Sequence, residues 1–97
     1  MTTFDLTQRS AIITGASAGI GAATAKHLAA RRVGVVLLAR SQDKLEALAS
    51  RIIETGGKAV ICVGDVADPG LMPRAIATAS EHFGPVDLLV NNAGLID

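Results

Sequence analysis

The pattern of apolar and polar residues divides the chain into four short apolar runs separated by three longer stretches. Each run has the length of a strand and is rich in Val, Ile, Leu or Ala, which is typical of parallel strands buried on both faces. The predicted strands are Ser10–Thr14, Val33–Ala39, Ala59–Val63 and Val86–Asn91. Because predicted helices separate them, we expect the order β-α-β-α-β-α-β with right-handed crossovers.

The three stretches between these runs predict helices. The first, Ile20–Arg31, is rich in alanine and can therefore lie close to a sheet. The second has Ser41 as a candidate cap and Gly56–Gly57 as its end. Its apolar residues recur at the spacing of one helix face, formed by Leu45, Leu48, Ala49, Ile52 and Ile53. The third is expected to begin at Asp68-Pro69 and to bury a stripe formed by Met72, Ile76, Ala79 and Phe83.

These elements predict an α/β fold with a doubly wound parallel sheet in the strand order 3-2-1-4. The chain shows no internal repeat, low-complexity segment or linker, so residues 1–97 are interpreted as part of a single domain. The fourth strand of such a sheet is normally an interior strand. A chain that stops there is expected to expose a hydrophobic edge that is prone to aggregation.

A glycine-rich loop, TGASAGIG, connects the first predicted strand to the first predicted helix. Gly15 allows a sharp exit from the strand, Gly19 allows the backbone to approach a pyrophosphate, and Gly21 allows the helix to pack closely on the strand. The hydroxyls of Thr14 and Ser17 can serve the loop or a ligand. A plain glycine turn is the alternative, but a strand before and a helix after favour a dinucleotide site. The expected loop contacts are Gly15, Ser17, Ala18, Gly19, Ile20 and Gly21.

Charge and composition narrow the class of protein. Nine basic and nine acidic residues cancel, so we expect no nucleic-acid partner and no attraction to an anionic membrane. No apolar run has the length of a membrane span, and the first ten residues do not resemble a secretory signal. Cys62 is the single cysteine, which fits a reducing compartment. We therefore expect a cytoplasmic enzyme or binding domain.

The spacing T-G-x-x-x-G-x-G, together with NNAG at Asn91–Gly94, resembles the classical short-chain dehydrogenase/reductase family. The resemblance covers the whole chain and implies a Rossmann-type fold. It also implies that the Asp65 carboxylate accepts a hydrogen bond from the adenine amino group and that Val66 packs near the ring. For Asp65, stabilisation of the turn before Asp68 is an equal alternative. The resemblance further implies that the asparagines tie strand four to its neighbours, and that Asn92 and Gly94 line the cofactor ribose.

The residue after the second predicted strand favours NADP(H) over NAD(H). Dinucleotide sites that prefer NAD commonly place an acid there, whereas this chain reads Ala39-Arg40. A carboxylate would repel a 2′-phosphate, and an arginine can hold it with paired, charge-assisted hydrogen bonds, to which the Ser41 hydroxyl can add. A solvated charge at a strand end is the alternative. Ala18 departs from the many NADP-binding relatives that carry a basic residue in the loop.

Several other residues are not expected to carry chemistry. His27 and His82 lack further ligands at suitable spacing, so we expect no metal site. Cys62 lies in an apolar run and is interpreted as a small buried side chain. Arg31-Arg32 stands where relatives usually have a glycine at the end of the first helix, which indicates a differently closed or strained turn.

The resemblance implies hydride transfer between nicotinamide and an alcohol or carbonyl substrate, carried out by Ser, Tyr, Lys and Asn residues that lie beyond Asp97. The chain contains no Tyr, so no residue within it can replace that acid/base. We therefore expect the cofactor-binding part of an oxidoreductase that lacks turnover alone and meets its substrate only when the remainder is supplied. Full-length relatives are usually homo-oligomeric. A standalone nucleotide-binding module and a non-functional remnant are the alternatives.

Overall fold

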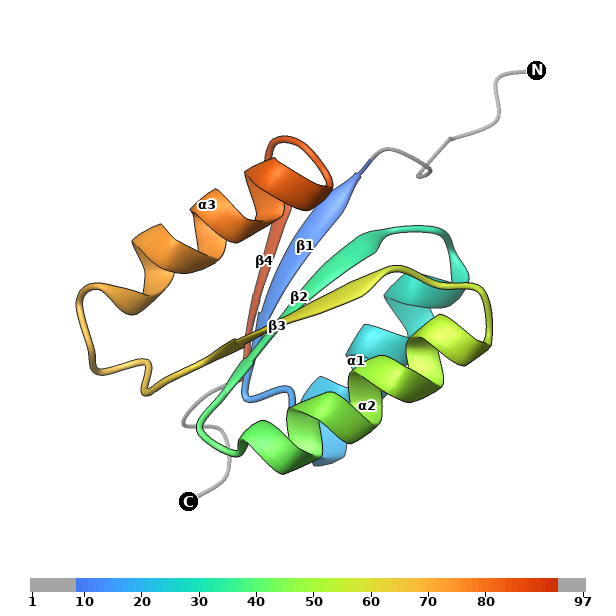
Figure 1. The fold of residues 1–97 in the computed structure, drawn as a ribbon, viewed down its shortest axis with the longest axis horizontal. Helices are drawn as coiled ribbons and strands as arrows, with labels where there is room; N and C mark the ends of the chain where they lie inside the picture. Colours follow the sequence, from blue (N-terminus) through green and yellow to red (C-terminus); the bar gives the residue numbers. More distant parts are fainter. Residues whose placement is uncertain (1–8, 93–97) are drawn as a thin grey trace.

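The computed structural model describes residues 9–92, and these form four strands and three helices (Figure 1). In chain order they are β1 (Ser10–Thr14), α1 (Gly19–Ala30), β2 (Gly34–Ala39), α2 (Gln42–Glu54), β3 (Ala59–Val63), α3 (Leu71–His82) and β4 (Leu88–Asn91). The predicted β-α-β-α-β-α-β order is confirmed. Three elements begin later than predicted: β2 begins at Gly34, α3 begins at Leu71 and β4 begins at Leu88.

The sheet has the strand order β3-β2-β1-β4, as predicted, and every pairing is parallel. Helices α1 and α2 cover one face of the sheet, and α3 covers the other (Figure 1). Because all four strands run in the same direction, their carboxyl ends lie along one edge of the sheet. Each segment that follows a strand is therefore brought to that edge.

The core consists of two apolar layers separated by the sheet. Every residue of β1 and β2 is buried, and successive side chains alternate between the two layers. Ile13 and Leu37 pack in the layer beneath α1 and α2, whereas Ile12 and Leu38 pack beneath α3. Cys62 is buried in the α3 layer, in agreement with its interpretation as a small core side chain.

Two residues that were predicted to be buried on helix faces are exposed. Ile53 on α2 is 56% exposed and Ile76 on α3 is 46% exposed. In α3 the buried stripe is instead formed by Leu71, Ala75 and Ala79. The small side chains of Ala75 and Ala79 let this helix lie close to the sheet, and Ile76, the next residue round the helix, faces solvent. The stripe on α2 is likewise narrow and ends at Ile52.

The helix ends agree only in part with the sequence analysis. Ser41 occupies the N-cap position of α2, but its hydroxyl makes no capping hydrogen bond. Gly56 ends α2 with a φ of 91°, and the Gly57 N–H donates to the Ile52 carbonyl at 2.9 Å, as a glycine-terminated helix requires. Asp68 precedes α3 and accepts a hydrogen bond from the Gly70 N–H at 2.9 Å through its Oδ1.

The turn between α1 and β2 is strained, as the missing glycine predicted. The Arg32 N–H donates to the Ala29 carbonyl, and the Val33 N–H donates to the Leu28 carbonyl. This is the bond pattern of a Schellman motif, which places one residue in the left-handed region. Here that residue is Arg32, with a φ of 70°, where glycine would carry no steric penalty.

Strand β4 differs from its neighbours because its side chains are largely exposed. Leu88 is 44% exposed and Leu89 is 52% exposed, and these consecutive residues point to opposite faces of the sheet. Within the described residues β4 pairs with β1 alone, so its other edge has no strand partner there. None of the helices in residues 9–92 is both long and apolar enough to cross a membrane.

Candidate dinucleotide site

The residues that the sequence analysis assigned to a cofactor lie along the carboxyl edge of the sheet. The glycine loop follows β1, Arg40 follows β2, Asp65 and Val66 come shortly after β3, and Asn92 follows β4. Parallel α/β sheets bind ligands at this edge, near the point where the strand order reverses. In the order β3-β2-β1-β4, that reversal lies between β1 and β4. Gly94 lies outside the described residues.

The glycine loop is held against the sheet by its own backbone. Gly15 and Gly19 have φ values of 62° and 60°, which most side chains would oppose. Between them, Ala16 is fully buried, and its N–H donates to the Leu38 carbonyl at 3.1 Å. The loop is therefore anchored to β2, while Ala18, Gly19 and Ile20 remain exposed at the surface.

The helix that follows the loop begins without a side-chain cap. Ala18 occupies the N-cap position of α1 and cannot accept a hydrogen bond through its side chain, and the first turn contains no acidic residue. The N–H groups of that turn therefore keep their capacity to bind an external acceptor, and the helix dipole adds a partial positive charge. Such an end is suited to a phosphate.

Gly21 lies in the closest contact between α1 and the loop. A Cβ at this position would lie 2.2 Å from the Gly15 carbonyl oxygen and 2.9 Å from the Gly15 carbonyl carbon. Both atoms belong to the backbone, which cannot give way as a flexible side chain can. Only glycine therefore allows the start of α1 to approach the end of β1 this closely, as the glycine spacing predicted.

Arg40 and Ser41 lie between the end of β2 and the start of α2. Arg40 is exposed, and its guanidinium forms no ion pair with residues 9–92. The Ser41 hydroxyl makes no capping hydrogen bond, so it is also available to a ligand. The Ala39 carbonyl accepts a hydrogen bond from the Gly64 N–H at 3.0 Å, which holds this corner against the segment after β3.

Asp65 has the turn contact that was one of its two predicted roles. Its Oδ1 accepts a hydrogen bond from the Ala67 N–H at 2.9 Å, and its carbonyl accepts one from the Asp68 N–H at 2.8 Å. The carboxylate is nonetheless exposed, and Val66 beside it is 51% exposed. An apolar side chain held at this edge next to a carboxylate is suited to a flat heteroaromatic ring that bears an amino group.

A small hydrogen-bond network joins the ends of β1 and β4. The Thr14 hydroxyl donates to Asn91 Oδ1 at 2.9 Å and accepts from the Asn92 N–H at 2.9 Å. The asparagines thus tie β4 to its neighbour, as the resemblance implied. The part played by Thr14 was missed because the sequence analysis assigned its hydroxyl to the glycine loop or a ligand. The predicted pairing of strands one and four could have indicated this contact, because it places Thr14 opposite Asn91 at the strand ends.

The side-chain amide of Asn92 provides a buried hydrogen-bond donor at this edge of the sheet. Its Nδ2 is closed off from solvent and has no hydrogen-bond partner among the described residues. A buried amide without a partner is costly, and an acceptor on a bound ligand would satisfy it. The uncapped helix end, the close contact at Gly21, the exposed Arg40 and this amide together fit a phosphorylated dinucleotide. Among residues 9–92, no three His, Cys, Asp or Glu side chains gather as a metal site would require.

The chain resembles known proteins over nearly all of its length. A model of the short chain dehydrogenase family matches residues 9–97. A fatty acyl-CoA reductase of Mycobacterium tuberculosis is 40% identical over 90 residues, which cover 93% of this chain and 31% of that protein. The crystal structure of a metagenomic short-chain oxidoreductase in complex with NADP superposes with a TM-score of 0.84 at 37% identity.

A second solved structure is similar to the same degree. L-sorbose reductase from Gluconobacter frateurii, complexed with NADPH and L-sorbose, has a TM-score of 0.84 and is 36% identical. Each structural match covers 94% of this chain, but only 41% of the metagenomic enzyme and 36% of the sorbose reductase. The chain therefore spans between 31% and 41% of the length of these three relatives.

Proposed function

Because the chain belongs to the short-chain dehydrogenase family, we propose that it forms the NADP(H)-binding part of an oxidoreductase. The nicotinamide of that cofactor would exchange hydride with an alcohol or carbonyl substrate. The residues of this chain bind and orient the cofactor. The proton transfers are carried out by residues of the full-length enzyme that lie outside this chain. The absence of Tyr from the sequence supports this division, because the family's acid/base is a tyrosine.

The observation that carries the proposal is the uncapped start of α1. No side chain caps this helix and no carboxylate lies in its first turn, so a pyrophosphate can accept hydrogen bonds from the free N–H groups. Gly15 and Gly19 shape the loop, with Ser17 beside them, and Gly21 seats the helix against it. Ala18 and Ile20 complete the exposed rim of the loop.

The other residues at this edge would bind the two ends of the adenosine half. The Asp65 carboxylate would accept from the adenine amino group through an oxygen that its turn contact leaves available, and Val66 would pack on the ring. Asn92 would donate its Nδ2–H to the cofactor and thereby satisfy a buried amide that has no partner within residues 9–92. Gly94 would line the ribose.

The preference for NADP(H) rests on Arg40. Its guanidinium is exposed at the end of β2 without an ion-pair partner in residues 9–92, and no carboxylate occupies this position. A 2′-phosphate would accept paired hydrogen bonds from the guanidinium and a further one from the Ser41 hydroxyl. NAD(H) lacks that phosphate and would gain nothing from either residue.

Binding of NADPH and NADH to the chain, followed by the fluorescence of the reduced nicotinamide, tests this preference. We expect NADPH to bind at least tenfold more tightly, a difference of about 1.4 kcal/mol. Arg40→Ala should remove that preference and leave NADH affinity unchanged. Arg51→Ala is the matched control, because Arg51 is an exposed arginine near the other end of α2. Equal affinities in the unaltered chain, or a preference that survives Arg40→Ala, would contradict the assignment.

The exposed strand β4 gives the proposal a second, independent support. Leu88 and Leu89 expose apolar surface on both faces of the strand. In an oxidoreductase about three times as long, a further strand and further helices would cover these side chains. Complementation by a polypeptide that carries the remaining part of a relative would restore turnover with an alcohol or carbonyl substrate. A well-folded assembly with bound NADPH that still shows no turnover would contradict the enzymatic role.

A further inference from the structure

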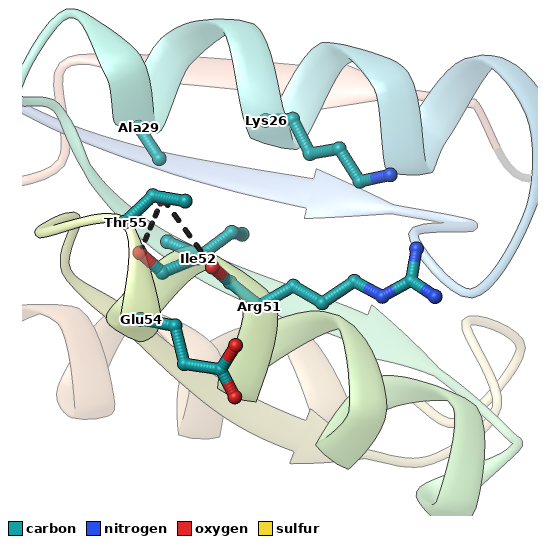
Figure 2. A pocket seen from close by; sticks show the side chains of 6 residues that line it. All are labelled: Lys26, Ala29, Arg51, Ile52, Glu54 and Thr55. Atoms are coloured by element: carbon teal, nitrogen blue, oxygen red, sulfur yellow. Dashed lines mark hydrogen bonds between the residues drawn. The ribbon is translucent and has the colours of Figure 1, made fainter.

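A groove lies between α1 and α2, on the face of the sheet that these two helices cover (Figure 2). Its volume is about 340 Å³, which lies at the small end of the range for sites that hold organic ligands. It is formed by the second half of each helix. The lining residues are Lys26, Ala29, Arg51, Ile52, Glu54 and Thr55.

The floor of the groove is apolar. Ala29 from α1 and Ile52 from α2 are only 5% and 2% exposed, and both belong to the core layer beneath the two helices. The Thr55 hydroxyl donates to the carbonyls of Arg51 and Ile52, so its proton is already used within α2. A ligand that enters the groove therefore meets methyl groups at its base.

The walls of the groove carry two cations, one from each helix. Figure 2 shows the charged ends of Lys26 and Arg51 turned toward the same end of the groove, whereas the Glu54 carboxylate points elsewhere. Neither cation forms an ion pair with residues 9–92. Two like charges that face one space repel each other, and an anion between them would turn that repulsion into attraction. Arg51 also lies in the last turn of α2, where the helix dipole favours a cation.

We propose that this groove binds a small organic monocarboxylate with an apolar body. The carboxylate lies between the Lys26 ammonium and the Arg51 guanidinium, which can bind it in a bidentate manner, and the apolar body covers Ala29 and Ile52. Two cations and the Glu54 carboxylate leave the lining with a single net positive charge, which one carboxylate neutralises. None of the six lining residues is among those assigned to the dinucleotide site.

Hexanoate is a suitable probe, followed through the methyl resonances of Ala29 and Ile52 in the intact chain. We expect saturable shifts with a dissociation constant of about 1 mM, weakened by added salt. Lys26→Gln and Arg51→Gln should each weaken binding at least fivefold, and Lys26→Arg, which keeps the cation, should restore it. Lys44→Gln is the control, because Lys44 lies in the first turn of α2 and does not line the groove. The methyl spectrum of each variant reports whether it is folded.

Three results would overturn the proposal. The first is the absence of a saturable shift with hexanoate in the folded chain. The second is an unchanged affinity for hexanoate in Lys26→Gln and Arg51→Gln, which would show that the two cations do not hold the carboxylate. The third is equal binding of hexanol, which lacks the charge, or of inorganic phosphate, which lacks the apolar body.

Discussion

Strands β1 and β4 are neighbours in the same sheet, yet they are packed in opposite ways. All five residues of β1 are buried, whereas three of the four residues of β4 are exposed and the fourth is half-buried. β1 has a strand on each side and a helix layer on each face, and it leads directly into the glycine loop. Within residues 9–92, the structural support for the phosphate end of the site is therefore buried on both faces, whereas β4 is largely uncovered.

The difference between β1 and β4 indicates which elements contribute most to the free energy of unfolding. Burial of apolar area is the main stabilising contribution, and it is concentrated in β1, β2 and the helices that cover them. β4 is held instead by its parallel pairing with β1 and by side-chain hydrogen bonds at its two ends. Just before β4, Asp87 Oδ2 accepts a hydrogen bond from the Ser10 N–H at the start of β1, at 3.0 Å. At the carboxyl ends of the two strands, the Thr14 hydroxyl donates to Asn91 Oδ1.

Matched leucine substitutions should show the largest contrast between the two regions. Leu37 is fully buried in β2, so Leu37→Ala should lower the free energy of unfolding by about 3 kcal/mol through lost contacts and an unfilled cavity. Leu89→Ala should cost about 0.5 kcal/mol or less, because the side chain is 52% exposed. Urea denaturation measures both. Similar losses for the two variants would mean that β4 is covered in solution, for example by a second molecule.

Two glycine-to-alanine substitutions test the close contact between the loop and α1. Their expected effect on the free energy of unfolding is smaller than that of Leu37→Ala. Gly21→Ala should cost about 2 kcal/mol and abolish NADPH binding, since the added Cβ would meet the Gly15 carbonyl at 2.2 Å. Gly70→Ala is the control, because its Cβ would approach nothing closer than Asp68 Oδ1 at 3.4 Å. Thermal denaturation and NADPH fluorescence report the two effects. Wild-type binding by Gly21→Ala would refute the close-approach argument.

The turn after α1 should give the smallest effect, and it has the opposite sign. Arg32 has a φ of 70°, so Arg32→Gly should raise the free energy of unfolding by about 1 kcal/mol by relieving steric strain. Arg31 has a φ of −94°, and Arg31→Gly should therefore destabilise the chain slightly. Both changes remove one positive charge, so electrostatics cannot account for a difference in sign. Two variants of equal stability would show that the turn stores no strain.

The apolar runs were sufficient to predict the strands and their order, because strands buried on both faces leave a continuous signal. Periodicity was less reliable at the margins of the helices, where Ile53 and Ile76 sit one residue beyond the buried stripe. A single helix turn cannot distinguish such a position from a core position. The close packing of Ala75 and Ala79 on the sheet, which decides the matter, depends on the tertiary structure.

The candidate site could be predicted where the chemistry is local, as in the glycine loop and at Arg40. The link from Thr14 to Asn91 and Asn92 could not, because it joins residues more than seventy positions apart through a strand pairing. The burial of the Asn92 amide, which has no partner among the described residues, and the groove between α1 and α2 likewise arise only when distant segments meet.

The most direct test of the central claim is an NADPH titration of the isotopically labelled chain, followed through its backbone amide resonances. We predict that the largest shifts fall on Gly19, Ile20 and Gly21 at the start of α1 and on Arg40 after β2. The amides of Ile52 and Thr55 at the far end of α2 should not move. A folded chain whose glycine-loop amides do not respond to NADPH would contradict the claim that this helix end binds the cofactor.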